Sequence, residues 1–417
     1  MGITRGAKFQ VSNRGTAAYP LLCFRSQISN PFSIFYEGKP IKLSFNVILV
    51  ALIVTVLISR TCQILLKPLR QPKLVSELIG GIMVGPSLLS QSPKFMSMVF
   101  PPTSEFVMKN LGIMGFMLFL FLCGVKMDMG LLKRSGKKQI CVALSSVIVP
   151  VIIVTVVGTC TRKSMDGKLA RIASFGAISS SLAVTTFPIQ YIVLQELNLL
   201  SSDVGNMALS TALISDAIGV NFMSLFEALK QLEVSIQSAV WYYLSTLVFI
   251  VFLLTAARQA MLWIIRNTPE GQPVDQFYVI VIFLAVFAFG FLTDMLGLAV
   301  CNGSFWLGLV IPDGPPLGAT LVEKCETIIM EVFLPCSFAF IGFCTDFEVM
   351  KDAGWSALSP LFGMIISGYL AKFISTLLPA KMVGLSWRES FAISLVLSMR
   401  GHVDLILYYH WVDKNVC

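Results

Sequence analysis

Apolar runs long enough to cross a lipid bilayer recur along this chain from Phe45 onward, and short polar connectors join them. A segment inside the bilayer must pair all its backbone N–H and C=O groups within the protein, which a helix does by itself. Only 13% of the 417 residues are charged, whereas soluble domains carry about 25%. The pattern predicts an all-α polytopic bundle, a multi-pass integral membrane protein whose surroundings are the lipid bilayer. We count about twelve runs, near residues 44–66, 74–92, 111–127, 139–159, 172–195, 204–226, 240–265, 277–293, 296–311, 328–345, 355–379 and 387–410.

The net charge of +8 comes from the first half of the chain, where lysines and arginines crowd the connectors at residues 133–138 and 162–171. Basic segments beside membrane helices typically face anionic lipid on the cytoplasmic side, so we interpret them as topogenic and expect no nucleic-acid partner. The two connectors are consecutive and lie on opposite sides of the membrane. Charge alone therefore does not fix the orientation.

The amino-terminal residues and the cysteines give no sign of a cleaved signal, a disulfide framework or a metal site. Residues 1–43 hold scattered basic side chains but no apolar core followed by a cleavage site, and we predict a disordered tail there. Residues 44–417 are then the transmembrane domain. The ten cysteines form no CxxC pair and no Cys/His ligand set, so neither a disulfide framework nor a zinc site is indicated and no cofactor is expected.

Two segments of the first half recur in the second half. Residues 119–128 (FLFLCGVKMD) resemble residues 338–346 (FAFIGFCTD), and a glycine-rich stretch ending in proline precedes each, at 80–86 and 303–312. Chance similarity between apolar helices is common, and it remains one interpretation. The other is a pair of homologous halves packed as inverted repeats, with a transport site at their interface near the middle of the membrane.

Each half also contains an interrupted helix. The run 179–188 is rich in hydroxyl groups and ends at Pro188, and a proline removes a backbone donor and frees carbonyl groups in the preceding turn. In the last run, Arg400 and Gly401 interrupt an otherwise apolar stretch. Either span alone is best explained as an ordinary kink. Together, interrupted helices in corresponding positions of two halves indicate a transporter's substrate site.

Asp216 is an ionisable residue in the middle of an apolar run, where a charge costs about 2.5–3.5 kcal/mol on insertion scales. Small residues recur along the same helix at a spacing of four, at Ala208 and Ala212 and again at Thr211, Ser215 and Gly219. Such rows let neighbouring backbones approach closely, so we expect the carboxylate to face the interior of the bundle. A carboxylate there can bind either a proton or a metal cation.

Two cations in later runs are candidate partners for this carboxylate. Lys372 lies several turns from either end of its run, which makes it too deep to reach the interface easily. Arg400 cannot lose its proton and is a fixed charge. We interpret His402 as a packing residue and the other charges near span ends as helix caps or interfacial anchors, namely Arg60, Lys126, Asp128, Asp294, Asp313 and Asp346.

At these residues the chain resembles the plant cation/proton exchanger (CHX) family of monovalent cation:proton antiporters, over residues 43–415. The resemblance implies the fold of the bacterial sodium/proton antiporters. That fold has a dimerisation domain and a core domain with two crossed, broken helices. The motifs that carry it are residues 74–87, 119–128 and 181–188, Ser215-Asp216, Leu334-Pro335, Ala371-Lys372 and Arg400-Gly401.

The resemblance also assigns roles to individual residues. Asp216 matches the family's shared cation- and proton-binding aspartate, and Lys372 matches the lysine that forms a salt bridge with it. Thr185 and Thr186 lie in the first broken helix, and Arg400 is the basic residue of the second.

The chain departs from the family pattern at several points. The residue before the aspartate, usually asparagine in the family, is Ser215, whose hydroxyl can still contact a cation. Lys126 stands where relatives often have a glutamate, and Arg400 stands where a lysine is common. The family continues with a thirteenth helix and a cytoplasmic regulatory domain. Because this sequence ends at Cys417, we expect both to be missing.

The function that follows is exchange of a monovalent cation, K⁺ or Na⁺, for a proton by alternating access, in a homodimer of the plasma membrane or an endomembrane. With one carboxylate in the membrane we predict electroneutral exchange and a role in pH homeostasis, and no enzyme activity. The alternative is a transport-inactive short form that regulates or pairs with full-length exchangers. An intramembrane aspartyl protease needs two facing aspartates, and only Asp216 is mid-span; a channel filter of repeated motifs is not visible.

Overall fold

The structure is a computed structural model that describes residues 44–406, apart from residues 70, 128–129, 131–135, 163–171, 233–234, 270–271, 353 and 402. Every regular element within that part of the chain is a helix. The predicted tail at residues 1–43, Asp128, His402 and the last turn of the twelfth run lie outside the described residues. The many apolar side chains on the outer faces of these helices, such as Ile64 and Leu57, suit a protein surrounded by lipid.

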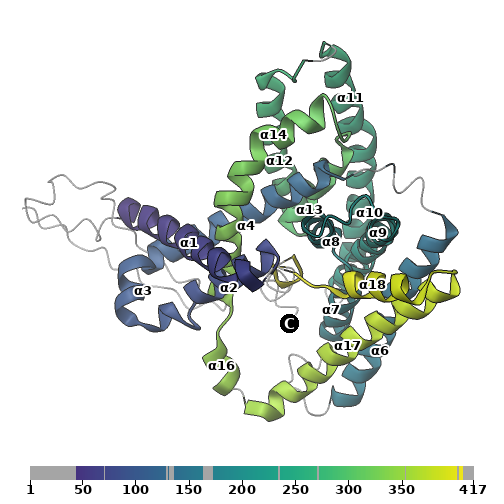
Figure 1. Cartoon of the computed structure of the whole chain (residues 1–417), viewed down its shortest axis with the longest axis horizontal. Helices are drawn as coiled ribbons and strands as arrows, with labels where there is room; N and C mark the ends of the chain where they lie inside the picture. The colour runs from purple at the N-terminus through teal and green to yellow at the C-terminus, as the bar shows by residue number, and fades with distance from the viewer. Residues whose placement is uncertain are drawn as a thin grey trace, which may run out of the picture.

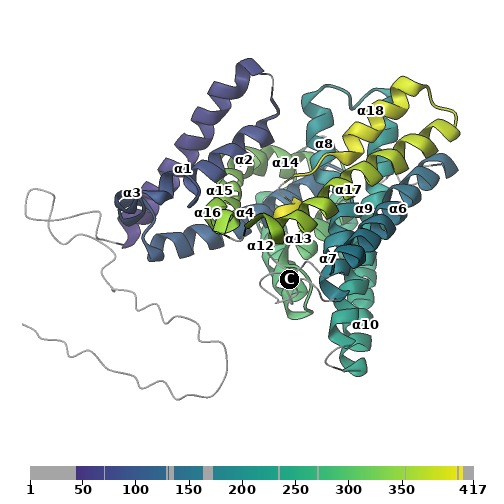
Figure 2. The ribbon, with the colours of Figure 1, turned by 90° about the horizontal axis from the view of Figure 1, so that it is seen from below.

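One group of helices, which we call the panel, lies on one side in both views (Figures 1 and 2). Its central members are α4 and α15, which pack against each other, while α2 packs on α15 and α13 packs on α4. The panel comprises α1 (Ser44–Leu66), α2 (Lys73–Val84), α3 (Pro93–Val99), α4 (Pro102–Val125), α12 (Gln276–Met295), α13 (Val300–Val310), α14 (Leu317–Ile328) and α15 (Leu334–Cys344).

Glycines bring the panel helices into backbone contact, and they follow the predicted repeat. A Cβ at Gly81 of α2 would overlap the Phe338 carbonyl of α15, and one at Gly342 would overlap the Gly81 carbonyl. In the same way, a Cβ at Gly308 of α13 would overlap the Phe121 carbonyl of α4. The glycine-rich segment of each half therefore packs on the FLFLCG-like segment of the other half. Two halves related by a two-fold axis produce this crossed arrangement.

A second group, which we call the core group, forms the other side of the molecule. Two of its long helices, α6 and α17, run together in Figure 1, and α9 packs on α6, α7 and α8. The core group comprises α6 (Lys137–Thr161), α7 (Ile172–Ala183), α8 (Phe187–Glu196), α9 (Asp203–Leu232), α17 (Gly354–Met382) and α18 (Trp387–Ser398). Outside the two groups are α10 (Ile236–Phe252) and α11 (Arg258–Asn267), which connect them along the chain, and the short α16 (Phe347–Asp352).

The two interrupted helices are present where the sequence places them. The first consists of α7 and α8, separated by the non-helical residues 184–186, and Pro188 occupies the second position of α8, where its missing N–H costs nothing. The second consists of α18 and a short helical stretch at 403–406, with Met399 in extended conformation between them. The predicted fold, with two broken helices that cross, is confirmed.

The predicted number of spans is not reproduced as twelve continuous helices. Among the described residues, eight helices are long and apolar enough to cross a membrane, and they match eight of the twelve runs. The runs 172–195 and 387–410 are divided by the interruptions, and 296–311 contains the short α13 of 11 residues. The run 204–226 falls within α9, a helix of 30 residues.

Candidate ion-binding site

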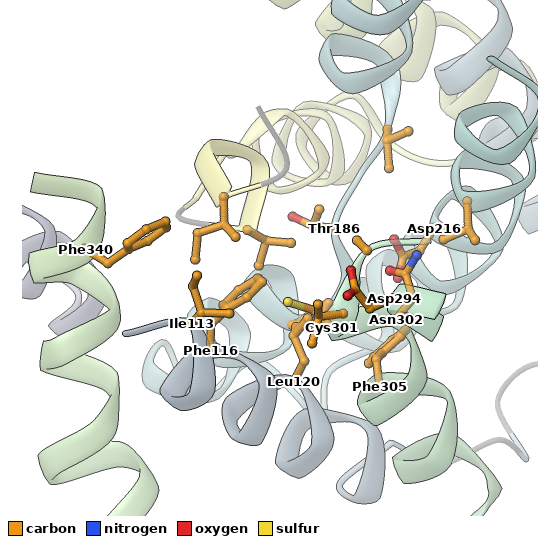
Figure 3. A pocket seen from close by; sticks show the side chains of 17 residues that line it. Ile113, Phe116, Leu120, Thr186, Asp216, Asp294, Cys301, Asn302, Phe305 and Phe340 are labelled. Carbon is orange, nitrogen blue, oxygen red and sulfur yellow. The ribbon is translucent and has the colours of Figure 1, made fainter. Parts of the chain in front are cut away.

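Asp216 lies in α9 with only 7% of its surface exposed, and it lines a cavity of about 200 Å³. The cavity lies between the panel and the core group (Figure 3). Phe116 and Leu120 of α4, Phe305 of α13 and Phe340 of α15 contribute apolar walls on the panel side. As expected, the carboxylate faces the interior of the bundle.

Two further polar side chains of the panel line the same cavity, and sequence analysis assigned neither of them to the site (Figure 3). Asp294 is exposed near the end of α12, and Asn302 is half-buried in α13. Asp294 was interpreted as a cap or anchor at a span end. It does lie at the end of its helix, but it also adds a second carboxylate to the cavity that holds Asp216. Together these groups offer oxygen atoms to a cation along one cavity wall.

The amino-terminal end of α8 is directed at Asp216. The backbone N–H of Phe187, the first residue of α8, donates toward the Asp216 carboxylate. The first N–H groups of a helix lack partners within it and carry partial positive charge, so an anion is favoured there. Thr186 precedes Phe187 and lines the cavity, and its hydroxyl is buried without a hydrogen-bond partner in the described part of the chain.

The carboxyl-terminal end of α7 is held by the two predicted cations. Arg400 donates to the carbonyl groups of Ser181, Leu182 and Val184, and the fully buried Lys372 donates to the carbonyl of Ala183. These carbonyls belong to the last turn of α7 and the residue after it, where the helix dipole is negative. A guanidinium group has five donors in a planar fork, which allows one side chain to serve three carbonyls.

The second interruption is held by neutral donors instead. The Gln190 amide of α8 donates to the carbonyls of Val396 (3.2 Å) and Met399 (3.3 Å), and the Thr185 hydroxyl lies 3.5 Å from the carbonyl of Leu397. Gly401 packs against Ile189, leaving no room for a Cβ. The two broken helices thus satisfy each other's freed backbone groups where they cross.

The expected ion pair between Asp216 and Lys372 is not formed in this structure. Within the described residues, the Lys372 ammonium is bound to the Ala183 carbonyl and Asp216 receives the N–H of Phe187. The physical reason is that the two helix ends at the first interruption carry opposite partial charges. Each charged side chain is stabilised by the end of opposite sign.

Ser215 also lies elsewhere than expected. Its hydroxyl is fully buried and 3.0 Å from the Ser146 hydroxyl of α6, so it joins α9 to α6. It does not line the cavity that contains Asp216. Among the residues named from sequence, the structure brings Asp216 and Thr186 together at one cavity and places Lys372, Arg400 and Thr185 at the crossing.

The expectation of a single membrane carboxylate is wrong. Asp404 is only 5% exposed and lies 3.8 Å from Arg400, four residues earlier in the chain. Glu77 of α2 is only 2% exposed and lies 3.8 Å from Lys73. Both acids lie in predicted apolar runs, four residues after a basic residue, and that spacing could have identified them.

A helical membrane bundle with two crossed, broken helices and a buried carboxylate beside them has the architecture of the secondary transporters. A solved structure has the same fold: the chain resembles the sodium proton antiporter MjNhaP1 from Methanocaldococcus jannaschii with a TM-score of 0.56 at 15% identity, over 88% of this chain and 86% of that one. Residues 50–416 match the model of the transmembrane sodium/hydrogen exchanger family, and the chain belongs to that family.

Curated relatives confirm the resemblance to plant cation/proton exchangers. Arabidopsis thaliana cation/H(+) antiporter 24 is 39% identical over 98% of this chain, and cation/H(+) antiporter 25 is 36% identical over 96%. This chain covers 48% and 47% of those two proteins, so it spans about half the length of the curated relatives it matches. The relatives are transporters and not enzymes, which removes the protease interpretation.

Proposed function

We propose that this chain forms the membrane part of a monovalent cation/proton antiporter in which Asp216 binds either the cation or the proton. The observation that carries the proposal is a buried carboxylate at the wall of a cavity between two groups of helices, beside a broken helix. The exposed Asp294 and the half-buried Asn302 give a cation polar contacts on its way to Asp216. Because one carboxylate cannot hold both ions, the two flows are coupled.

Lys372 supplies the competitor for the cation in this proposal. Its ammonium is held by the Ala183 carbonyl in this structure, and in the proposed cycle the side chain leaves that carbonyl to pair with an ionised, empty Asp216. A cation that arrives at Asp216 returns the ammonium to the carbonyl. The core group then moves against the panel and exposes Asp216 on the other side of the membrane.

The proposed exchange is electroneutral. Asp216 holds one cation or one proton in turn, and Arg400 keeps its charge throughout the cycle because a guanidinium group does not lose its proton. A net charge carried per cycle would add about 2.3 kcal/mol per 100 mV of membrane potential. Potassium and sodium are both candidates for the cation, and a homodimer stays our expectation for the assembly.

Purified protein in liposomes tests the proposal, with a pH-sensitive dye inside and K⁺ or Na⁺ added outside. We expect cation-dependent proton flux that Asp216→Asn reduces to the level of empty liposomes. The matched control is Asp203→Asn, the same change at an exposed position of the same helix, which should stay within about twofold of the wild type.

Each other outcome has a distinct meaning. Flux that survives in Asp216→Asn would refute the role of that carboxylate. Flux that changes with membrane potential at fixed ion and pH gradients would refute electroneutrality. A folded wild type without flux that coprecipitates with a full-length relative would favour the transport-inactive partner instead.

A further inference from the structure

A second cavity, of about 520 Å³, lies on the opposite face of the short helix 403–406 from the Asp216 cavity. Successive residues of an α-helix point about 100° apart. Val403 and Ile406 line the Asp216 cavity, whereas Asp404 and Leu405 line the second cavity. This one helical turn therefore separates the two cavities.

Asp404 lines the second cavity, and one of its two carboxylate oxygens has no hydrogen-bond partner among the described residues. Its Oδ2 accepts a hydrogen bond from the Gly401 N–H at 3.2 Å. Its Oδ1 is buried without a hydrogen-bond partner among the described residues and is 3.8 Å from Arg400 Nη1, too far for a direct hydrogen bond. In the described part of the chain, Arg400 Nε is also buried without a partner, while Nη1 and Nη2 donate to the carbonyls of residues 181, 182 and 184.

We propose that Asp404 is a second proton-binding carboxylate, separate from Asp216 and reached through the second cavity. A proton from water in the cavity binds a lone pair of Oδ1, no other bond changes, and the negative charge of Asp404 is removed. A buried carboxylate oxygen without a donor is costly, and a proton supplies what the fold does not. Nothing in this assignment requires Asp216 to be the transport site.

The lining of the second cavity favours a proton over a metal cation. A bound K⁺ or Na⁺ needs several oxygen ligands, and here a neighbouring guanidinium repels it as well. The polar side chains on the cavity wall other than Arg400 and Asp404 are Ser181 and Tyr369. The remaining wall is mostly hydrocarbon, from Leu78, Ile178, Leu182, Leu361, Ile365 and Leu405.

The charges around Asp404 connect it to the site at Asp216. Arg400 on its own segment and Lys372 on α17 attract the ionised form, while Asp216 on α9 repels it across the interruption. Tyr369 of α17 is the other titratable group at this wall, and the segments of α2 and α7 that line it are uncharged. Protonation of Asp404 removes a like charge from the surroundings of Asp216 and so favours the anion that binds a cation.

Infrared difference spectra of the full chain in lipid nanodiscs, recorded while the pH is changed, test this assignment without requiring transport. A carboxyl side chain shows the C=O stretching band of a carboxylic acid only while it is protonated, and it loses that band when it ionises. We expect one such band to be lost in Asp404→Asn and retained in Asp216→Asn. Asp404→Glu should shift the band without abolishing it, and Asp203→Asn should leave it unchanged.

Three results would overturn the proposal. Spectra of the wild type and Asp404→Asn that coincide over the whole titration would show that Asp404 neither binds nor releases a proton in that range. A band at Asp404 that responds to added K⁺ at fixed pH would show a metal site. If Asp404→Asn does not fold, the shifted band of Asp404→Glu decides the question, because its absence would equally overturn the assignment. Loss of flux in Asp216→Asn bears on the proposed function alone.

Discussion

The joints inside the panel and the boundary between the panel and the core group are built differently. Inside the panel, Gly81 and Gly342 bring the backbones of α2 and α15 together with no space for a single carbon atom. At the boundary, the Glu196 carboxylate at the end of α8 accepts from the Lys73 backbone N–H at 3.2 and 3.1 Å. That boundary also contains the Asp216 cavity and a third cavity, of about 200 Å³, beside Glu196.

This difference indicates which parts can move. Close-packed interiors do not deform continuously, so α2 and α15 are expected to move as one body. The boundary has apolar packing too, but its cavities and its exposed charged contact should let it separate and re-form more easily than the glycine contacts inside the panel. Because the alternating access proposed above needs one group to move against the other, the structure places the tight joints within the groups and the weak contacts between them.

The largest expected effect comes from Gly342→Ala. The added methyl group would overlap the backbone carbonyl of Gly81, which cannot move away as a flexible side chain would. We expect a destabilisation of more than about 3 kcal/mol, the upper end for overpacking, and little folded protein. Thermal melting in detergent, followed by size-exclusion chromatography, measures it.

Gly363→Ala is the matched control for that change. Gly363 lies within α17, and a Cβ there meets no atom within 4 Å. The control should melt at or slightly above the wild-type temperature, since alanine is the better helix former. Equal melting of both variants would refute the idea that the panel is a rigid body.

Gln190→Leu tests whether the core group is joined as firmly at its crossing helices. The change leaves the carbonyls of Val396 and Met399 without their donor in a buried place, at a cost of about 1–3 kcal/mol. A lower melting temperature is expected, whereas Gln195→Leu, on an exposed position of the same helix, should change it little. Unchanged melting in Gln190→Leu would mean that the two broken helices are held together by other contacts.

Much of this arrangement could be predicted from local sequence. Pro188 and Gly401 mark interruptions because the first lacks an N–H and the second gives the chain room to pass closely against Ile189. The glycine-rich segments showed the repeat for the same steric reason. Asp216, Lys372 and Arg400 were found because charges in apolar runs are rare.

Partners and cavity walls depend on tertiary structure and could not be predicted in the same way. Lys372 binds the Ala183 carbonyl because the α7 end arrives there from a segment 189 residues distant. Asp294 resembles a helix cap in the sequence, because a single acidic residue at the end of an apolar run is expected both at a helix end and at the mouth of a cavity. Asp404 is different, since its position four residues after Arg400 in an apolar run is visible in the sequence.

Glu196→Gln gives the smallest effect on stability and the most direct test of the boundary. The neutral amide oxygen can still accept from the N–H of Lys73, but it loses the attraction of a carboxylate to the positive end of α2. Because the contact is exposed, we expect less than about 1 kcal/mol of destabilisation and an unchanged melting temperature. If breaking this contact is part of the barrier to movement of the core group, the same loss of about 1 kcal/mol would change the rate of exchange up to about fivefold. The measurement is proton flux in liposomes beside the melting curve, with the exposed Gln195→Leu as the control on the same turn.

A changed rate of exchange with an unchanged melting temperature would show that the contact between Glu196 and Lys73 opens during the cycle. An unchanged rate would mean that the core group moves without breaking it, and the boundary would then have to be sought elsewhere.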